Sequence, residues 1–328
     1  MARLLVLGGA GFVGYHLAER LSGEGHALTL VDDLSRGSMD RELAALCARP
    51  HVTFVQADLT RAGALDLLPG DWDQVYMLAA IVGVRNVVGD PARVVRVNTL
   101  ALLNVLAWLP GRGAALFFSS TSENYAGGVA SGTVPVPTPE DVPLSVADIA
   151  APRFAYAASK ILGEAAVLHT LRAHGIRHVV GRFHNVYGPR MGADHVIPEL
   201  SLRALRGEDP FRVYGPGQRR AFCHVSDAVE AMVRLMALPS IPEPIVNIGN
   251  AAEETRVEDL ARLILKVAGF APRIEAVPAP AGSVDRRCPD IGRLRGLTGF
   301  VPKVGLEAGV AKTFAWYRDW HTRGGATP

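Results

Sequence analysis

A tyrosine and a lysine four residues apart are the first pair in this sequence that could act together chemically. Tyr156 and Lys160 begin and end the run Tyr-Ala-Ala-Ser-Lys, in a stretch predicted to be helical. Residues four apart lie on one face of a helix. An ammonium beside a phenol favours the phenolate and lowers the phenol pKa from about 10 toward neutrality. The pair could therefore take a proton from a substrate hydroxyl. The alternative is an exposed helical pair with no chemical role.

Lysine is rare in this chain, which makes its presence at position 160 informative. The sequence has 34 lysine and arginine residues, of which only four are lysines, and Lys160 is the only lysine before Lys266. Arginine is bulkier, planar and permanently charged, so it cannot replace lysine as a compact donor. This preference indicates a specific use for an ammonium group at position 160.

Two further candidates follow a strand predicted over 114–119, in the run Ser-Ser-Thr-Ser-Glu. Thr121 offers a hydroxyl that could bind the reacting oxygen. Glu123 is an acid just beyond an apolar strand, so we expect partial desolvation to raise its pKa. The alternative is that Ser122 and Glu123 only cap a turn.

A second candidate site lies near the N-terminus, where glycines recur at a predicted strand-to-helix junction. Gly8, Gly11 and Gly14 form the pattern G-x-x-G-x-x-G. Glycine permits a tight turn and lets a pyrophosphate approach the amides of a helix N-terminus. The residues of this turn that we expect to contact a dinucleotide are Gly8, Gly11, Phe12, Val13 and Gly14.

Asp32 indicates which dinucleotide the turn would bind. It ends a strand predicted over 27–32, 18 residues after Gly14. A carboxylate there would accept hydrogen bonds from the adenosine ribose and repel a 2′-phosphate, so NAD is favoured over NADP. Arg36 argues the other way, because an arginine nearby can accept a 2′-phosphate. With NAD as hydride acceptor, Tyr156 would remove the hydroxyl proton from the carbon that loses hydride.

Five more residues at strand ends are candidates for contact with the cofactor. Asp58, with Leu59 beside it, follows the third predicted strand and would cap the adenine ring. Leu78, Ala79 and Ala80 end or follow the fourth, and the alanines are small enough to let the cofactor pass over the sheet edge. A turn aspartate and tight packing are the alternative explanations.

The predicted elements alternate between strand and helix through the first half of the chain. Short apolar runs predict strands over 3–7, 27–32, 52–56, 74–78, 114–119 and 178–182. Apolar spacing predicts helices over 12–22, 91–109 and 156–174. This alternation predicts an α/β fold with a Rossmann-type, doubly wound parallel sheet covered on both faces. The carboxyl ends of such strands share one edge, where sites are built.

The regular alternation of strand and helix ends near residue 188, which predicts a division into two parts. We expect residues 1–188 to form an NAD-binding Rossmann domain and residues 189–328 to form mainly a smaller C-terminal α/β lobe that binds substrate. Residues 246–249 include a short apolar run that could return to the main sheet. Residues 127–152 are rich in Pro, Gly and Val, which makes them a candidate functional loop or lid.

Composition and charge exclude several classes of protein. The 328 residues are 49% hydrophobic and 20% charged, which is typical of a globular chain rather than a disordered one. The net charge of +2 does not favour a nucleic-acid or membrane partner. No apolar run reaches the length of a transmembrane helix. Three widely spaced cysteines predict neither a disulfide framework nor a metal site, and they favour a reducing compartment, by default the cytoplasm.

Taken in order, these motifs resemble those of extended short-chain dehydrogenase/reductases, in the NAD-dependent epimerase/dehydratase group that remodels nucleotide sugars. The resemblance covers nearly the full chain. The matching segments are Gly8-Gly-Ala-Gly-Phe-Val-Gly14, Asp32, Leu78-Ala-Ala80, Asn98, Ser119-Ser-Thr121, Tyr156…Lys160, Arg182-Phe-His-Asn-Val-Tyr-Gly-Pro-Arg190, Arg220-Ala-Phe222, Asn247-Ile-Gly249 and Arg286-Arg-Cys-Pro-Asp290.

The resemblance implies roles for several residues of this chain. Tyr156 would be the base, Lys160 would bind the nicotinamide ribose, Thr121 would bind the substrate hydroxyl, and Asn98 would support the active site. The substrate would be a nucleotide-diphosphate sugar. The residues implied to hold its diphosphate are Asn185, Arg220 and Arg287, and those implied to line its base pocket are Val196, Ile197 and Tyr214. The resemblance also implies a homodimer formed through a four-helix bundle of the helices predicted over 91–109 and 156–174.

The family resemblance leaves several reactions open. All begin with oxidation of the sugar C4 hydroxyl and end with return of the hydride. An epimerase is the first reading, because it is the commonest outcome in the group. A UDP-glucuronate-type decarboxylase is second, because decarboxylases carry Thr-Ser-Glu, and a 4,6-dehydratase using Glu123 is third. A non-catalytic dinucleotide sensor is an alternative of a different class. Met77 departs from the group's pattern, which usually has histidine there.

Overall fold

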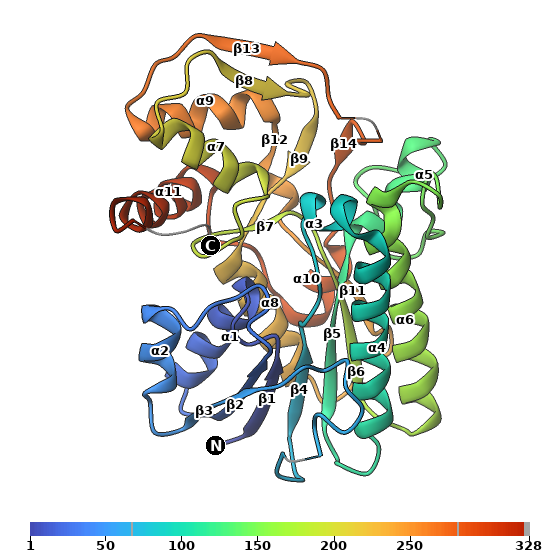
Figure 1. Ribbon diagram of the computed structural model, residues 1–328. Coiled ribbons are helices and arrows are strands. Elements are labelled where there is room, and N and C mark those ends of the chain that lie inside the picture. The colour runs from blue at the N-terminus through green and yellow to red at the C-terminus, as the bar shows by residue number, and fades with distance from the viewer. Residues whose placement is uncertain (67, 281, 325–328) are drawn as a thin grey trace. The chain divides into compact units, whose positions relative to one another are not determined.

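The computed structural model describes residues 1–328 except 67, 281 and 325–328. The chain divides into two compact units, each built from three separate segments (Figure 1). Unit 1 comprises Met1–Asn124, Asp148–Arg182 and Val229–Val246, and unit 2 comprises Tyr125–Ala147, Phe183–Ala228 and Asn247–Pro328. These units interleave along the sequence, and the functional division at residue 188 stays a prediction.

A seven-stranded sheet is the main feature of unit 1. Its strand order is β11-β6-β5-β4-β1-β2-β3, and the pairs from β5 to β3 are parallel. The strands are β1 (Arg3–Leu7), β2 (Ala27–Asp32), β3 (Val52–Gln56), β4 (Gln74–Met77), β5 (Ala115–Thr121), β6 (His178–Phe183) and β11 (Ile245–Ile248). The sequence therefore predicted the Rossmann-type parallel sheet correctly. Because these pairs are parallel, Gly8, Asp32 and Thr121 all lie at or just beyond the carboxyl ends of their strands.

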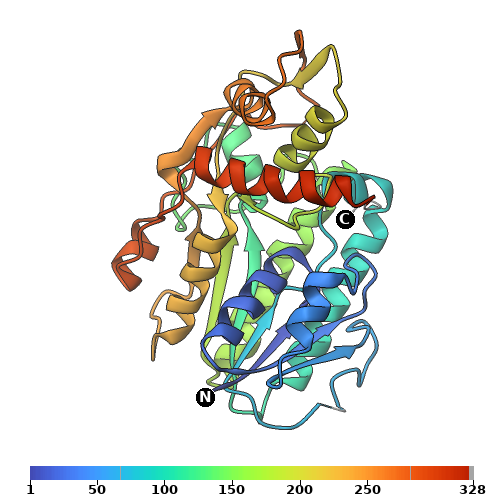
Figure 2. The ribbon, with the colours of Figure 1, turned by 90° about the vertical axis from the view of Figure 1, so that its left-hand side faces the viewer.

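Helices cover both faces of this sheet. Figure 2 shows α1 and α2 in front of the strands, and Figure 1 shows α4 and α6 on the other side. The helices are α1 (Phe12–Gly23), α2 (Arg41–Cys47), α3 (Val84–Gly89), α4 (Pro91–Trp108), α6 (Ala155–Ala173) and α8 (Val225–Ala237), with short 3-10 turns η1 (Ser122–Tyr125) and η2 (Pro152–Phe154). A Cβ at Gly163 of α6 would lie 2.6 Å from Phe118 and 3.1 Å from Leu102. Glycine here lets α6 pack closely on β5 and α4.

Three features differ from the sequence prediction. Helices α2, α3 and α8 were not predicted. Helices α2 and α3 each span fewer than two full turns and show little periodicity. Strand β5 continues to Thr121 rather than ending at residue 119. A short helix, α5 (Ala126–Ala130), opens the segment predicted to be a loop over 127–152.

Unit 2 holds three small sheets, ordered β12-β9-β14, β13-β8 and β10-β7. Their strands are β7 (Val186–Tyr187), β8 (Phe211–Tyr214), β9 (Arg219–Ala221), β10 (Cys223–His224), β12 (Glu254–Arg256), β13 (Ile274–Val277) and β14 (Arg286–Arg287). The remaining elements are α7 (Val196–Leu205), η3 (Ala251–Glu253), α9 (Val257–Ala268), α10 (Gly292–Thr298) and α11 (Leu306–Thr322). Helices α7, α9 and α11 pack together.

Most of the segment predicted to be a functional loop, up to Ala147, belongs to unit 2 and is anchored there. Thr138 donates its amide to the carbonyl of Cys288 at 2.9 Å, and Asp290 donates its amide to the carbonyl of Thr138 at 2.9 Å. The Glu140 carboxylate accepts the amide of Asn247 at 2.9 Å. The first two bonds tie the segment to the Arg-Arg-Cys-Pro-Asp motif, and the third ties it to β11.

No helix among the described residues is both long and apolar enough to cross a membrane.

Candidate active site

The hydroxyls of Tyr156 and Thr121 are hydrogen-bonded to each other. Tyr156 lies in the first turn of α6, and Thr121 is the last residue of β5. Thr121 Oγ1 also accepts the backbone amide of Glu123 at 3.2 Å. The charge of Glu123 acts on the Tyr156 phenol. The structure therefore brings together three of the four residues that the sequence placed in the catalytic set.

Lys160, the fourth, lies one turn along α6 from Tyr156, and its side chain is 3% exposed. Its Nζ donates to the carbonyl of Ser119 at 2.7 Å. The same nitrogen lies 4.7 Å from the ring centroid of Phe118 and 5.8 Å from that of Tyr156. Burial lowers the pKa of Lys160 to about 7, and the nearby Glu164 opposes this decrease.

The pKa of Tyr156 is raised in this structure, which corrects the expectation from the sequence. Burial is the main cause, the charge of Glu123 adds to the increase, and the hydrogen bond with Thr121 opposes it. Lys160 does not offset these effects, because its ammonium bonds the carbonyl of Ser119 rather than the phenol. A positive charge near the phenol would favour its ionised form.

The glycine turn fits a dinucleotide pyrophosphate. A Cβ at Gly14 would lie 2.1 Å from the carbonyl oxygen of Gly8, and a Cβ at Gly8 would lie 2.6 Å from the amide nitrogen of Ala79. Gly8 also has φ +90°, a conformation that favours glycine. The helix α1 begins at Phe12, directly after Gly11. Glycine is therefore required for this close backbone approach, and it is followed by a helix N-terminus, whose amides favour an anion.

Asp32 lies beside this turn at the end of β2. Its carboxylate accepts the amides of Ala10 at 3.1 Å and Leu34 at 2.9 Å. Burial raises the pKa of Asp32, whereas these two amide bonds and the charge of Arg36 lower it. The carboxylate thus shapes the loop that faces the glycine turn, and its hydrogen bonding to a ribose stays a prediction.

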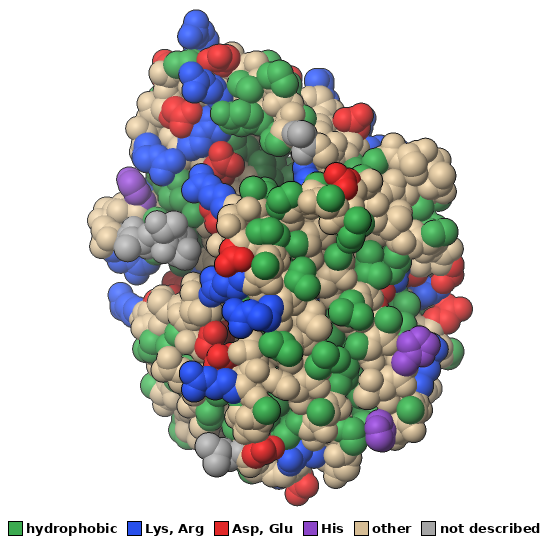
Figure 3. Space-filling model, turned by 45° about the vertical axis from the view of Figure 1, so that its right-hand side comes forward, with side chains coloured by type: hydrophobic (Ala, Val, Ile, Leu, Met, Phe, Trp, Pro, Cys, Tyr) green, Lys and Arg blue, Asp and Glu red, His purple; other side chains and the backbone are tan. Residues whose placement is uncertain are grey.

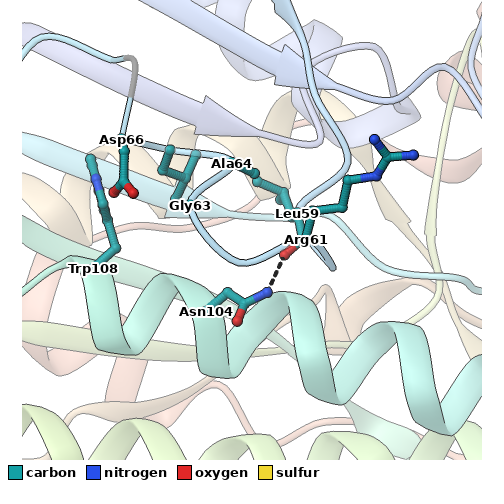
Figure 4. Close-up of a pocket in the computed structure, with 8 residues that line it drawn as sticks. Leu59, Arg61, Gly63, Ala64, Asp66, Asn104 and Trp108 are labelled. Atoms are coloured by element: carbon teal, nitrogen blue, oxygen red, sulfur yellow. Dashed lines mark hydrogen bonds between the residues drawn. The ribbon is translucent and has the colours of Figure 1, made fainter.

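Asp58 and Leu59 are fixed by local contacts. Asp58 Oδ1 accepts the amide of Thr60 at 2.9 Å and its hydroxyl at 2.7 Å, and these bonds lower the pKa of Asp58. The carbonyl of Leu59 accepts Nδ2 of Asn104 at 2.8 Å. Figure 4 shows this bond in a small pocket between α4 and the loop after β3. The Asp58 loop is therefore held against α4 where an adenine contact is predicted.

Asn98 links three parts of unit 1. Its Oδ1 accepts the amide of Ile81 at 2.7 Å, and its Nδ2 donates to the carbonyl of Ile81 and to Ser159 Oγ, both at 3.2 Å. Ser159 is the neighbour of Lys160 on α6. Asn98 therefore ties α4 to the helix that carries the lysine, and its supporting role in the active site stays a prediction.

The residues predicted to hold the substrate's diphosphate belong to unit 2. Arg220 on β9 and Arg287 on β14 are directly paired across neighbouring strands. The Arg220 guanidinium donates to the carbonyls of Val284 at 2.7 Å and Arg219 at 2.8 Å. Asn185 has φ +41° and donates Nδ2 to the carbonyl of Ala221 at 3.0 Å. Two predicted diphosphate ligands are thus adjacent, and Asn185 is bonded to the residue after Arg220.

The predicted base-pocket residues differ in exposure. Tyr214, at the end of β8, is 45% exposed and could stack on a base. Val196 begins α7 and is partly buried, whereas Ile197 is 1% exposed. Contact of these residues with a nucleotide stays a prediction.

A buried polar cluster behind Lys160 was missed by sequence reasoning. Glu164 accepts hydrogen bonds from Ser120, Asn124 and Arg182, all buried. The signal in the sequence was the position of Glu164, four residues after Lys160 on the same helix face. Its partners come from other elements, so spacing alone could not reveal them.

The chain is similar to known proteins over most of its length. Residues 4–249 match the model of the NAD dependent epimerase/dehydratase family. The chain is 33% identical to UDP-glucuronic acid decarboxylase 1 of Xenopus tropicalis, over 96% of this chain and 72% of that protein. It is 32% identical to UDP-N-acetyl-alpha-D-glucosaminuronate decarboxylase of Bacillus cytotoxicus, over 97% of this chain and 98% of that protein.

A solved structure is also similar over nearly the whole chain. The UDP-glucose 4-epimerase of Thermus thermophilus, solved in complex with NAD, superposes with a TM-score of 0.80 at 30% identity, covering 96% of this chain and 99% of that one. The cofactor of the family is NAD. With its sheet, its glycine turn and its Tyr156/Lys160/Thr121 cluster, this chain belongs to the NAD-dependent epimerase/dehydratase family.

Proposed function

We propose that this protein is an NAD-dependent nucleotide-sugar decarboxylase acting on UDP-glucuronate or a closely related UDP-linked uronic acid. The observation that carries this proposal is the position of Glu123, beside Thr121 and within electrostatic reach of Tyr156. An acid at this point can act on a sugar carbon next to C4. The names of two relatives, a UDP-glucuronic acid decarboxylase and a UDP-N-acetyl-alpha-D-glucosaminuronate decarboxylase, support the same choice.

Proton removal from the C4 hydroxyl is the first step. Thr121 binds this hydroxyl, and Tyr156 takes its proton. Bound NAD supplies the hydride acceptor and a positive charge near the phenol, and later returns the hydride. Lys160 keeps an ammonium beside the site, where it binds the nicotinamide ribose. The amides that begin α1 hold the pyrophosphate, which fits the glycine turn.

Loss of carbon dioxide is the second step. In the 4-keto sugar the C5 carboxylate lies β to the ketone, so the C5–C6 bond breaks and its electron pair moves toward the C4 oxygen. Glu123, once it has taken a proton from solvent, delivers that proton to C5 and returns to the carboxylate form. The hydride returns to C4 and Tyr156 returns the proton to the C4 oxygen. The net products are a UDP-pentose and carbon dioxide, with NAD regenerated.

Epimerisation at C4 is the second candidate. The family and the similar UDP-glucose 4-epimerase favour it, and it needs only Thr121, Tyr156, Lys160 and room for the keto sugar to rotate. Epimerisation requires no chemical step from Glu123.

Incubation with a panel of UDP-, GDP-, ADP- and CDP-sugars, followed by mass analysis, distinguishes a decarboxylase from an epimerase. A product lighter by carbon dioxide supports a decarboxylase, whereas an unchanged mass with a new retention time identifies an epimerase. Tyr156→Phe, with NAD still bound, is the inactive control.

The substrate's diphosphate is proposed to bind the paired arginines. Guanidinium groups match phosphate oxygens in a fork geometry, and Arg220 and Arg287 are adjacent on β9 and β14. The neighbouring Arg286 donates its guanidinium to both oxygens of Glu254 at 2.6 and 2.8 Å. In this proposal residues 1–188 bind NAD and residues 189–328 bind mainly the nucleotide sugar.

A homodimer is proposed through α4 and α6. Apolar side chains are exposed on these helices and on α3, and Figure 3 shows apolar surface on this face. They are Val84, Val88, Val95, Leu100, Leu103 and Leu162. Exposed apolar surface of this kind marks interaction sites. A second copy presenting the same two helices would complete a four-helix bundle.

A cytoplasmic location is also proposed. The three cysteines form no disulfide, which is typical of proteins in a reducing compartment.

A further inference from the structure

Glu164 is a buried carboxylate one helical turn beyond Lys160, and its oxygens join three elements. Its Oε1 accepts Ser120 Oγ at 2.5 Å and Asn124 Nδ2 at 2.9 Å. Arg182 of β6 donates Nε to Oε1 at 2.9 Å and Nη2 to Oε2 at 2.6 Å. The side chains of Glu164 and Arg182 are each 3% exposed.

The position of this cluster relates it to the catalytic residues. Ser120, which bonds Glu164, lies between Ser119 and Thr121 on β5. The carbonyl of Ser119 accepts the Lys160 ammonium, and Thr121 bonds Tyr156. Glu164 therefore fastens the helix that carries Tyr156 and Lys160 to the strand end that carries their partners.

The buried Glu164–Arg182 ion pair is not explained by stability alone. A buried ion pair often contributes no more than apolar residues of the same volume. A charge near Lys160 has a specific effect, however. Burial favours the neutral form of Lys160, and the negative charge of Glu164 favours its ammonium form.

The groups around Lys160 come from three elements. Its own helix supplies Tyr156 and Glu164, and β5 supplies the ring of Phe118 and the carbonyl of Ser119. Strand β6 contributes Arg182, which engages Glu164. Of the charged groups, Glu164 is the one whose charge stabilises the ammonium.

We propose that Glu164 is a positioning residue for the reaction, which keeps Lys160 protonated and holds the end of β5 in register with α6. It touches neither substrate nor cofactor. Its effect reaches the reaction through Lys160 and through Ser119 to Thr121. The electrostatic part concerns the protein alone and is independent of which sugar is the substrate, whereas the effect on turnover rests on the proposed function.

Titration of the lysines by NMR tests the electrostatic part directly. With ¹³Cε-lysine labelling the chain gives four signals, and Lys266, Lys303 and Lys312 are exposed internal references. We expect Lys160 to titrate well below the other three. In Glu164→Gln its midpoint should move lower still, because the removed negative charge no longer favours the ammonium, while the three references stay unchanged. An unchanged Lys160 midpoint in this variant overturns the proposal.

Two further variants keep the test decisive. If Glu164→Gln does not fold, the double variant Glu164→Gln/Arg182→Met removes both buried charges. A smaller downward shift is then expected, because losing the positive charge of Arg182 partly offsets losing the negative charge of Glu164. Glu208→Gln is the matched control, since Glu208 also binds an arginine through two hydrogen bonds of 2.8 Å but lies in unit 2. A shift of the Lys160 midpoint in this control would contradict the assignment.

Kinetics test the positional part once a substrate is known. Glu164→Gln should lower kcat by on the order of 10–10²-fold with little change in KM, because misplacement by about 1 Å can cost 10²-fold. In the pH profile of kcat for this variant, the alkaline limb should move to lower pH, as the Lys160 midpoint does. A variant that only loses stability would keep the wild-type profile per folded molecule, and that result would reject the role. Failure to decarboxylate any sugar leaves the NMR result standing, so the two proposals fail separately.

Discussion

The pKa of the Tyr156 phenol depends on its neighbours, some of which raise it and one of which lowers it. Burial and Glu123 raise its pKa, and Thr121 lowers it through a hydrogen bond. The sequence identified all three residues, because their types and spacing carry chemistry. It did not predict the direction of the Tyr156 pKa, because the Lys160 ammonium turns to the carbonyl of Ser119. That contact depends on a neighbouring strand and is invisible in spacing along one helix.

Replacing Glu123 by glutamine tests its role in proton transfer. Glu123→Gln should keep NAD binding and C4 oxidation, while overall turnover falls by on the order of 10²–10⁴-fold, the usual contribution of a general acid or base. Reduced cofactor or a 4-keto sugar should accumulate, measured by absorbance and mass analysis. The exposed Glu275→Gln is the matched control. Near-wild-type turnover would remove Glu123 from the mechanism and favour simple epimerisation.

Replacing Lys160 by methionine tests the cost of burying an ammonium. Because burial lowers the pKa of Lys160 from 10.5 to about 7, the unfolded chain binds more protons between these values. The wild-type free energy of unfolding should therefore rise with pH across this window relative to Lys160→Met. Urea unfolding of the cofactor-free proteins at pH 7 and pH 9 measures it. A difference between the two proteins that does not change with pH would contradict the shift.

Elements place these residues, and the sequence predicted most of the elements in unit 1. Strands β1, β2 and β3 have the predicted bounds, because continuous apolar runs end at clear turn residues. Helices α2 and α3 were missed because short helices carry little periodicity. The Glu164–Arg182 pair was missed for a different reason, since it joins α6 to β6 and only folding brings these elements together.

The turn between β1 and α1 gives a prediction with a control in the same helix. In Gly14→Ala the new Cβ would lie 2.1 Å from the carbonyl oxygen of Gly8, so the turn must shift. NAD affinity should fall by at least about tenfold, the equivalent of about 1.4 kcal/mol. In Gly23→Ala nothing lies within 4 Å of the new Cβ, so NAD affinity should be retained. Calorimetric titration of both variants with NAD measures the two affinities. Equal affinities would contradict a pyrophosphate site at the glycine turn.

At the scale of the whole molecule, exposed apolar residues on α4 predict self-association. Leu103 is 46% exposed on this helix. Leu103→Glu should convert a dimer to a monomer in light scattering after gel filtration, because a charge would be buried at the interface. Val301→Glu, at an apolar position that is 51% exposed in unit 2, is the control and should leave the mass unchanged. If the wild-type protein is monomeric at micromolar concentration, that result would contradict the proposed dimer through the four-helix bundle of α4 and α6.

Decarboxylation of a UDP-linked uronic acid can be measured most directly in heavy water. When UDP-glucuronate reacts in D₂O, the proton delivered to C5 after loss of carbon dioxide comes from groups that exchange with solvent, whereas the hydride at C4 comes from the sugar itself. Mass analysis should therefore find a UDP-pentose that carries one non-exchangeable deuterium, and NMR should place it at C5. A product of unchanged carbon count with no deuterium would contradict decarboxylation and identify the protein as a 4-epimerase.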